Sequence, residues 1–115
     1  MIINKFFPIK LYQESSKKIP VYEWLKEFDE AERQIIDRDI KYIQYTWPWK
    51  MPLIKSLGGG LMELRIKLRN RQVRIFFILY KGSIILLHGF VKKTQKPPIN
   101  ELSKAQKRMK QVKQL

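Results

Sequence analysis

The sequence predicts a single α+β domain in which two amphipathic helices pack on a mainly antiparallel sheet. Three features support this fold class: alternating apolar and polar residues between positions 61 and 91, apolar stripes at helical spacing between positions 21 and 43, and a basic helical segment after position 100. A chain of 115 residues with 44% apolar content is long enough for one hydrophobic core. We therefore expect residues 1–115 to form one domain.

The N-terminal segment, residues 2–12, is rich in Ile, Phe and Tyr and is predicted to be a strand. Pro8 interrupts it and has no backbone N–H to donate to a neighbouring strand. We therefore expect this strand to lie at an edge of the sheet or to break at Pro8.

Two helices are predicted next. Pro20 suits the first turn of a helix, and four apolar residues follow on one helical face: Val21, Trp24, Leu25 and Phe28. Asp29 and Glu32 have the spacing of a capping box, which predicts a second helix after a tight break. The apolar face of this second helix is formed by isoleucines: Ile35, Ile36, Ile40 and Ile43.

Residues 46–60 contain two prolines and end in three glycines, so we expect a connection into the sheet. Lys55 lies in this connection. The glycines lack the Gly-Lys-Ser/Thr ending of a phosphate-binding loop, and no strand-turn-helix pattern follows. A nucleotide-binding loop is therefore rejected.

The centre of the chain predicts three consecutive antiparallel strands, near residues 61–68, 73–80 and 84–91. Turns are expected at Asn70-Arg71 and at Lys81-Gly82-Ser83. These loop lengths place Lys67 opposite Arg74, Arg65 opposite Phe76, Arg74 opposite Phe90 and Phe76 opposite His88.

Strand alternation then divides these residues between two faces of the sheet. One face is entirely apolar: Met62, Leu64, Ile66, Leu68, Val73, Ile75, Phe77, Leu79, Ile85, Leu87, Gly89 and Val91. The other face carries charged and aromatic residues: Glu63, Arg65, Lys67, Arg74, Phe76, His88, Phe90 and, beyond the last strand, Lys92. We expect the two helices to cover the apolar face and the other face to be an exposed functional surface.

A short basic helix is predicted from Asn100 to the C-terminal region. Its apolar stripe is thin, and lysines and Arg108 occupy the other sides: the stripe consists of Leu102, Ala105, Met109 and Val112. We expect this helix to be weakly docked or frayed at its end.

Positive charge is concentrated in the second half of the chain, which has a formal net charge of +14. Residues 1–60 hold 10 basic and 8 acidic side chains, whereas residues 91–115 hold 8 basic and 1 acidic. Such asymmetry favours a polyanionic partner, most often a nucleic acid. Phe76 and Phe90 lie among the arginines, and stacking on aromatic and guanidinium planes is typical of proteins that bind single-stranded RNA.

Composition also excludes several classes of function. The chain has no cysteine, which excludes disulfides, thiolate catalysis and cysteine-ligated zinc. It has one histidine and no carboxylates at ligand spacing, so no metal or other cofactor is expected. The N-terminus does not have the pattern of a signal peptide, and no apolar run approaches the roughly 18 residues that span a bilayer. We expect a soluble cytoplasmic protein that does not associate with membranes.

The order of elements resembles the RelE/ParE superfamily of bacterial toxins, and several strings resemble its phage-derived, HigB-like branch. The strings are Pro20-Val21-x-Glu23-Trp24-Leu25, Pro52-Leu53-Ile54-Lys55-x-Leu57, Gly60-Leu61-x-Glu63-Leu64-Arg65, and Leu87-His88-Gly89-Phe90-Val91-Lys92-Lys93-Thr94. The resemblance extends from about Phe7 to Met109, and the last string is the most specific.

This resemblance implies a RelE-like fold and the toxin of a type II toxin-antitoxin system. Such a toxin is an mRNA interferase, an endoribonuclease that cleaves mRNA on the ribosome and so inhibits translation. Its implied partners are the ribosome, mRNA and a cognate antitoxin, often a helix-turn-helix protein of the HigA type, with which it can form a heterotetramer. The family's functional residues correspond to Arg65, Arg74, Phe90, Lys92 and Lys93. The family commonly has a tyrosine where this chain has Val73.

Metal-independent RNA cleavage requires activation of a 2′-hydroxyl, stabilisation of charge on the phosphate, and protonation of the 5′-oxygen. Arginine suits the second task because its guanidinium binds phosphate through two N–H groups and stays charged. The candidate catalytic residues are Arg65, Arg74, His88, Lys92 and Lys93. The candidate RNA-binding residues are Lys55, Lys67, Phe90 and Lys96.

Several alternatives stay open at this point. Arg65 can pair with Glu63 instead of a phosphate, and the general base is not assigned among His88, Glu63, Lys92 and Lys93. A ParE-type toxin, which shares the fold but poisons DNA gyrase, is one alternative function. A non-catalytic RNA-binding domain is the other.

Overall fold

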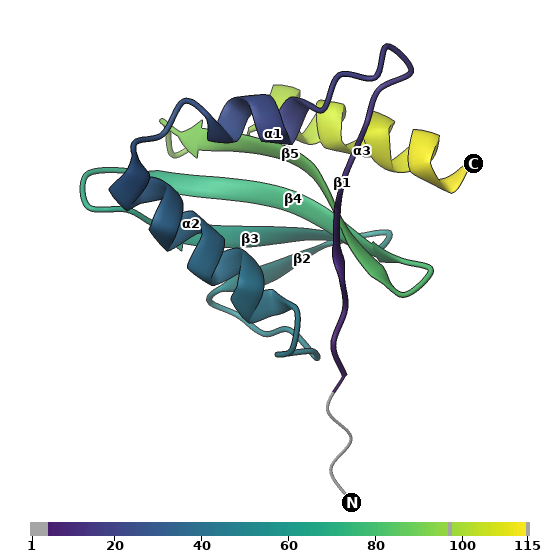
Figure 1. Ribbon diagram of the computed structural model, residues 1–115, viewed down its shortest axis with the longest axis horizontal. Helices are drawn as coiled ribbons and strands as arrows, with labels where there is room; N and C mark the ends of the chain where they lie inside the picture. Colours follow the sequence, from purple (N-terminus) through teal and green to yellow (C-terminus); the bar gives the residue numbers. More distant parts are fainter. Residues whose placement is uncertain (1–4, 97, 115) are drawn as a thin grey trace, which may run out of the picture.

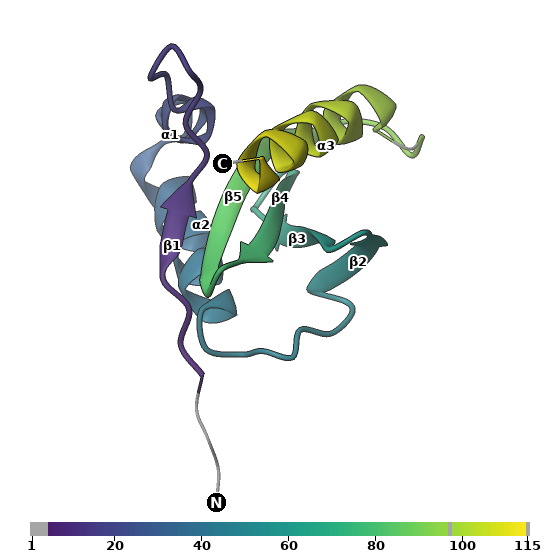
Figure 2. The same cartoon turned by 90° about the vertical axis from the view of Figure 1, so that its right-hand side faces the viewer.

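A computed structural model describes residues 5–96 and 98–114 of the chain. Its elements follow the order β1 (Ile9–Leu11), α1 (Pro20–Leu25), α2 (Glu30–Ile43), β2 (Ile54–Gly58), β3 (Leu61–Lys67), β4 (Gln72–Tyr80), β5 (Ser83–Lys92) and α3 (Ile99–Lys113). The sheet lies between α1 and α2 on one face and α3 on the other (Figures 1 and 2). Within the described ranges, no helix is long and apolar enough to cross a membrane.

The five strands form one mixed sheet in the order β1-β5-β4-β3-β2. β1 runs parallel to β5, and the other neighbouring strands are antiparallel. This arrangement confirms the α+β class and the edge position of the N-terminal strand, although β1 is only three residues long. Positions 2–4 of the predicted strand lie outside the described residues. The prediction of a plain connection through residue 60 is wrong, because β2 pairs with β3 along this segment.

The face beneath α1 and α2 holds the larger apolar core. The side chain of Asp29 accepts a hydrogen bond from the Glu32 backbone N–H, so the predicted cap at the start of α2 is confirmed. Ile36, Ile40 and Ile43 are buried in one apolar cluster with residues of β3 and β4. α1 packs on β5, where the ring of Trp24 occupies the space that a side chain at position 89 would need.

The pairing of β3 with β4 differs from the prediction by two residues. Arg65 lies opposite Arg74, and Lys67 lies opposite Gln72. The strands are joined by residues 68–71, a four-residue loop closed by a hydrogen bond from the Leu68 N–H to the Arg71 carbonyl. The predicted two-residue loop was therefore too short.

The pairing of β4 with β5 was predicted correctly beside the charged residues and incorrectly near the turn. Arg74 lies opposite Phe90 and Phe76 opposite His88, as expected. Only two residues separate the paired ends of β4 and β5 at the turn, one fewer than predicted. A bulge farther along adds one unpaired residue to β5, so the pairing beyond the bulge has the predicted register. Leu87 is the additional residue of β5 at this bulge.

The bulge also changes which side chains share a face. Ile84 and Leu86 lie in the core beneath α1 and α2, whereas Ile85 and Leu87 lie in a second core beneath α3. The prediction that Ile85 and Leu87 belong to the apolar face is therefore wrong. A bulge shifts the two-residue alternation by one position, which a strict period cannot anticipate.

The second core corrects the expectation that the other face is fully exposed. Phe76 and Phe90 are buried in one apolar cluster with Ala105 and Val112 of α3. The predicted stripe of this helix is confirmed, but the expectation of weak docking is wrong. The carbonyl of Leu87 accepts a hydrogen bond from Arg108, and the hydroxyl of Tyr12 bonds to Gln111.

Candidate functional site on the sheet beside α3

Side chains from four strands form three adjacent rows on the α3 face of the sheet. Directly paired residues share a face, so each row runs across the strands. The first row contains Lys67, Gln72 and Lys92; the second contains Arg65, Arg74 and Phe90; the third contains Lys55, Glu63, Phe76 and His88. Seven of the nine residues proposed from the sequence therefore lie on one surface. The other two, Lys93 and Lys96, follow the end of β5.

Glu63 is the buried centre of an ion-pair network between the two arginines. Its carboxylate oxygen accepts a hydrogen bond from Arg65 Nε at 3.0 Å and lies 3.9 Å from Arg74 Nε. The side chain of Glu63 is 8% exposed, whereas that of Arg65 is 30% exposed. The carboxylate offsets the charges of both arginines, and only Arg65 presents much of its guanidinium to solvent.

Arg74 is buried, which corrects the expectation that both arginines lie exposed. Its Nη2 donates to the side-chain oxygen of Gln72 at 2.9 Å, and its Nη1 donates to the Val73 carbonyl. Its Nε is buried without a hydrogen-bond partner among the described residues. Burial lowers the pKa of Arg74, while Glu63 opposes this shift and Arg65 adds to it.

His88 is held between two charged side chains of α3. A nitrogen of Arg108 lies 3.1 Å from His88 Nδ1, and a guanidinium can only donate, so Nδ1 accepts and the ring proton is on Nε2. Nε2 lies 3.3 Å from a carboxylate oxygen of Glu101, without hydrogen-bond alignment. Burial lowers the pKa of His88, outweighing the opposite effect of Glu101, and Arg108 and Lys104 lower it further. These contacts favour a neutral imidazole.

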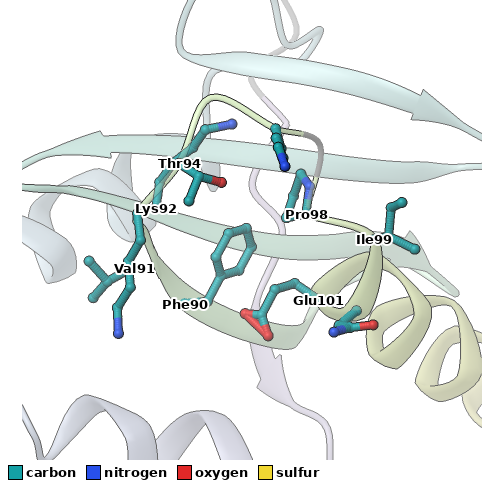
Figure 3. Close-up of a pocket in the computed structure, with 10 residues that line it drawn as sticks. Phe90, Val91, Lys92, Thr94, Pro98, Ile99 and Glu101 are labelled. Atoms are coloured by element: carbon teal, nitrogen blue, oxygen red, sulfur yellow. The ribbon is translucent and has the colours of Figure 1, made fainter.

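An open cleft of about 510 Å³ lies between the end of β5 and the start of α3. Lys92, Lys93, Thr94 and Lys96 line it together with Phe90. Figure 3 shows the Phe90 ring and the Glu101 carboxylate lying between the two segments. Phe90 is buried against Phe76, with ring centroids 5.3 Å apart, and stacks on His88. The expectation of a freely accessible stacking ring is therefore wrong, although Phe90 forms part of the cleft wall.

Comparison with known proteins identifies the family. A family model described as "Phage derived protein Gp49-like" matches residues 23–110, which include every candidate site residue. The chain belongs to this family. The Gp49-like family is part of the RelE toxin-like superfamily, and the five-stranded sheet with three helices is consistent with a RelE-like fold. No curated protein and no solved structure matches the chain.

Three residues of this Gp49-like site were not proposed from the sequence: Gln72, Glu101 and Arg108. Gln72 holds Arg74, and the correct strand pairing would have placed it between Lys67 and Lys92. Glu101 and Arg108 are seven residues apart, so they share one side of α3. Their helical spacing beside the apolar stripe was a detectable sign that they face the sheet.

Proposed function

We propose that this Gp49-like protein is the toxin of a type II toxin-antitoxin system and acts as a ribosome-dependent mRNA endonuclease. The observation that carries the proposal is the pairing of Arg65 with Arg74 on adjacent strands, beside Lys67 and Lys92. This arrangement provides a fixed guanidinium at the centre of a cationic surface. Membership of a RelE toxin-like family supports the same function.

In the proposed reaction, the 2′-hydroxyl of a ribose attacks the adjacent phosphate and the 5′-oxygen leaves. Arg65 binds a non-bridging phosphate oxygen, because its guanidinium is the more exposed of the two. Charge develops on this oxygen as the new P–O bond forms, and a preorganised donor stabilises that charge. Glu63 fixes the direction of Arg65 through the bond to Nε and leaves its terminal nitrogens for the phosphate.

Arg74 and His88 have positioning roles in this proposal. Arg74 supplies positive charge directly opposite Arg65 on the adjacent strand, while its own terminal nitrogens are engaged by Gln72 and the Val73 carbonyl. His88 is bound by Arg108 on one ring nitrogen and faces Glu101 with the other. Lys92 and Lys93 line the adjoining cleft and are the accessible groups for proton transfer or RNA binding.

In this proposal the ribosome holds the mRNA in position, which the open site does not do alone. The cationic surface is open, and holding the RNA in a reactive geometry makes a large contribution to rate. We therefore expect efficient cleavage of mRNA on the ribosome and slow cleavage of naked RNA. The partners proposed with this activity are mRNA, the ribosome and a neutralising antitoxin of the HigA type.

The deciding experiment compares cleavage by the purified protein with that by two variants from the same strand. Arg65→Ala should lower single-turnover mRNA cleavage on ribosomes by about 10²–10³-fold, the effect of losing one preorganised donor. Lys67→Ala is the matched control, exposed and two residues further along β3. It should weaken binding modestly and more strongly at low salt.

Other outcomes distinguish the alternative functions. Equal losses from the two substitutions would mean that the surface acts only through diffuse charge, and the role of Arg65 would be rejected. Inhibited translation with intact mRNA would indicate a non-catalytic RNA-binding domain. Growth arrest accompanied by broken DNA and intact mRNA would indicate a gyrase poison.

A further inference from the structure

An exposed aromatic patch lies at the end of α2 and in the loop that follows it. Four of the eight large exposed hydrophobic side chains among the described residues fall within positions 42–51: Tyr42, Tyr45, Trp47 and Met51. We use the name aromatic patch for these four residues. Figures 1 and 2 both place this loop at the opposite end of the molecule from α3, so the patch is separate from the candidate site.

The aromatic patch borders a preformed hollow, which two of its four residues line. A second cleft, of about 460 Å³, is lined by Tyr42 and Met51 with Pro48, Trp49 and Leu53. Trp49 fixes its wall, because its indole N–H donates to the Ile43 carbonyl at 2.9 Å and its ring packs on Phe77. A mainly apolar hollow bordered by exposed aromatic and Met side chains is typical of a protein-binding surface.

The chain segment that carries the aromatic patch has only positively charged side chains among its charged residues. No Asp or Glu occurs between positions 40 and 62, whereas Lys41 and Lys50 lie there, and Lys50 lines the hollow. Lys5 adds another cation, lying 4.3 Å from the centre of the Trp47 ring. The segment that carries Lys5 precedes β1 and is fixed here by the Phe7 N–H, which donates to the Gln44 carbonyl. The surface is therefore an apolar hollow with a cationic rim.

We propose that the aromatic patch binds an acidic amphipathic helix of a partner protein, independently of the activity proposed above. Such a helix places apolar side chains at positions i, i+3, i+4 and i+7 in a hydrophobic groove. Its carboxylates meet the lysines at the rim. A second copy of this chain is a poorer occupant, because it would bring the same lysines together. A flat membrane surface fits a hollow less well than a helix does.

The proposal can be tested with a defined probe, an acidic peptide of about 18 residues with Leu and Phe on one helical face and Glu on the other. NMR titration of the full chain should shift resonances of residues 41–54. Combined Trp47→Ala and Met51→Ser should weaken the affinity by about tenfold or more. Tyr22→Ala is the matched control, an exposed aromatic residue on α1, and should leave the affinity unchanged.

The remaining outcomes would overturn the proposal. These are the absence of binding, shifts confined to β3, β4 and β5, or equal binding of the same peptide with Lys in place of Glu. Patch-dependent binding to anionic vesicles without peptide binding would assign the surface to membranes. Patch-dependent dimerisation in sedimentation would assign it to a second copy. The single variant Met51→Ser provides the comparison if Trp47→Ala lowers the folded fraction seen by NMR.

Discussion

The two faces of the sheet are built from alternate residues of the same strands, yet they bury very different side chains. Under α1 and α2, the buried residues of β3 and β4 are all apolar, from Leu64 to Phe77. Under α3, buried phenylalanines lie beside buried Glu63 and Arg74. We call the first face, which α1 and α2 cover, the closed face. We call the second face, which is covered only where α3 reaches, the charged face.

This difference explains how one small sheet can provide both a stable core and a charged site. A buried charge is tolerable only when it is paired and hydrogen-bonded. Glu63 and Arg74 meet that condition in part by facing each other near the boundary of the second core. We therefore expect substitutions on the closed face to act on stability and those on the charged face to act on both stability and function.

The largest expected effect comes from Phe77→Ala on the closed face. Phe77 is fully buried and packs edge-on against Trp49, with ring centroids 5.1 Å apart. Truncation leaves a cavity and should lower the free energy of unfolding by about 3–5 kcal/mol. Urea denaturation measures this change. Leu79→Ala, two residues further along the same face but exposed, should cost less than about 1 kcal/mol; equal losses would contradict the closed-face comparison.

A smaller effect is expected from Gly89→Ala on β5. A methyl group at this position would overlap the ring of Trp24, which packs directly on the glycine backbone. Such overpacking typically costs about 1–3 kcal/mol, and thermal unfolding should show it. Trp24→Leu in the same chain should recover part of the loss, because it removes the clashing ring. A double-mutant cycle without coupling would show that the helix moves away freely.

Glu63→Gln tests how much the ion-pair network of the charged face contributes to stability, for comparison with the substitutions on the closed face. This change keeps the shape and removes the negative charge that Arg65 and Arg74 share. We expect the free energy of unfolding to fall by about 1–2 kcal/mol, because the amide oxygen can still accept one hydrogen bond. Arg65→Gln should cost less, since Glu63 keeps Arg74 as a partner. If Arg65→Gln costs more in urea denaturation, the network is not centred on Glu63.

The sequence was sufficient to predict the elements whose determinants are local. The cap at Asp29, the apolar face of α2 and the three central strands follow from short-range spacing, and all are present. The pairing of Arg74 with Phe90 was also predicted. It depended on a three-residue loop, whereas the structure combines a two-residue turn with the bulge at Leu87.

The features that sequence reasoning missed depend on contacts between distant segments. β2 has little strand character of its own and is fixed by pairing with β3. The burial of Phe90 follows from the docking of α3, whose thin apolar stripe is supplemented by polar contacts from Arg108 and Gln111. Neither arrangement is encoded in a local period, so the distribution of exposed and buried charge could not be predicted.

The smallest expected effect is a pH dependence of stability from His88, at the contact between the charged face and α3. Burial lowers its pKa from the ordinary value of 6.5, and Glu101 only partly opposes Arg108, Lys104 and burial. The unfolded chain therefore binds a proton more readily than the folded protein as pH falls below about 6.5. The free energy of unfolding should have its full value above this pH and decrease below it. The decrease should level off once the pH passes the lowered pKa of His88. We expect a loss below about 1 kcal/mol, because partial solvent access screens these charges.

Thermal unfolding between about pH 7.5 and about pH 5.5 measures this slope, because the carboxylates titrate mainly at lower pH. His88→Gln should remove the slope whatever its effect on the absolute melting temperature. Stability that instead rises toward acidic pH would mean that an imidazolium–Glu101 pair outweighs burial, and that α3 is held by charge.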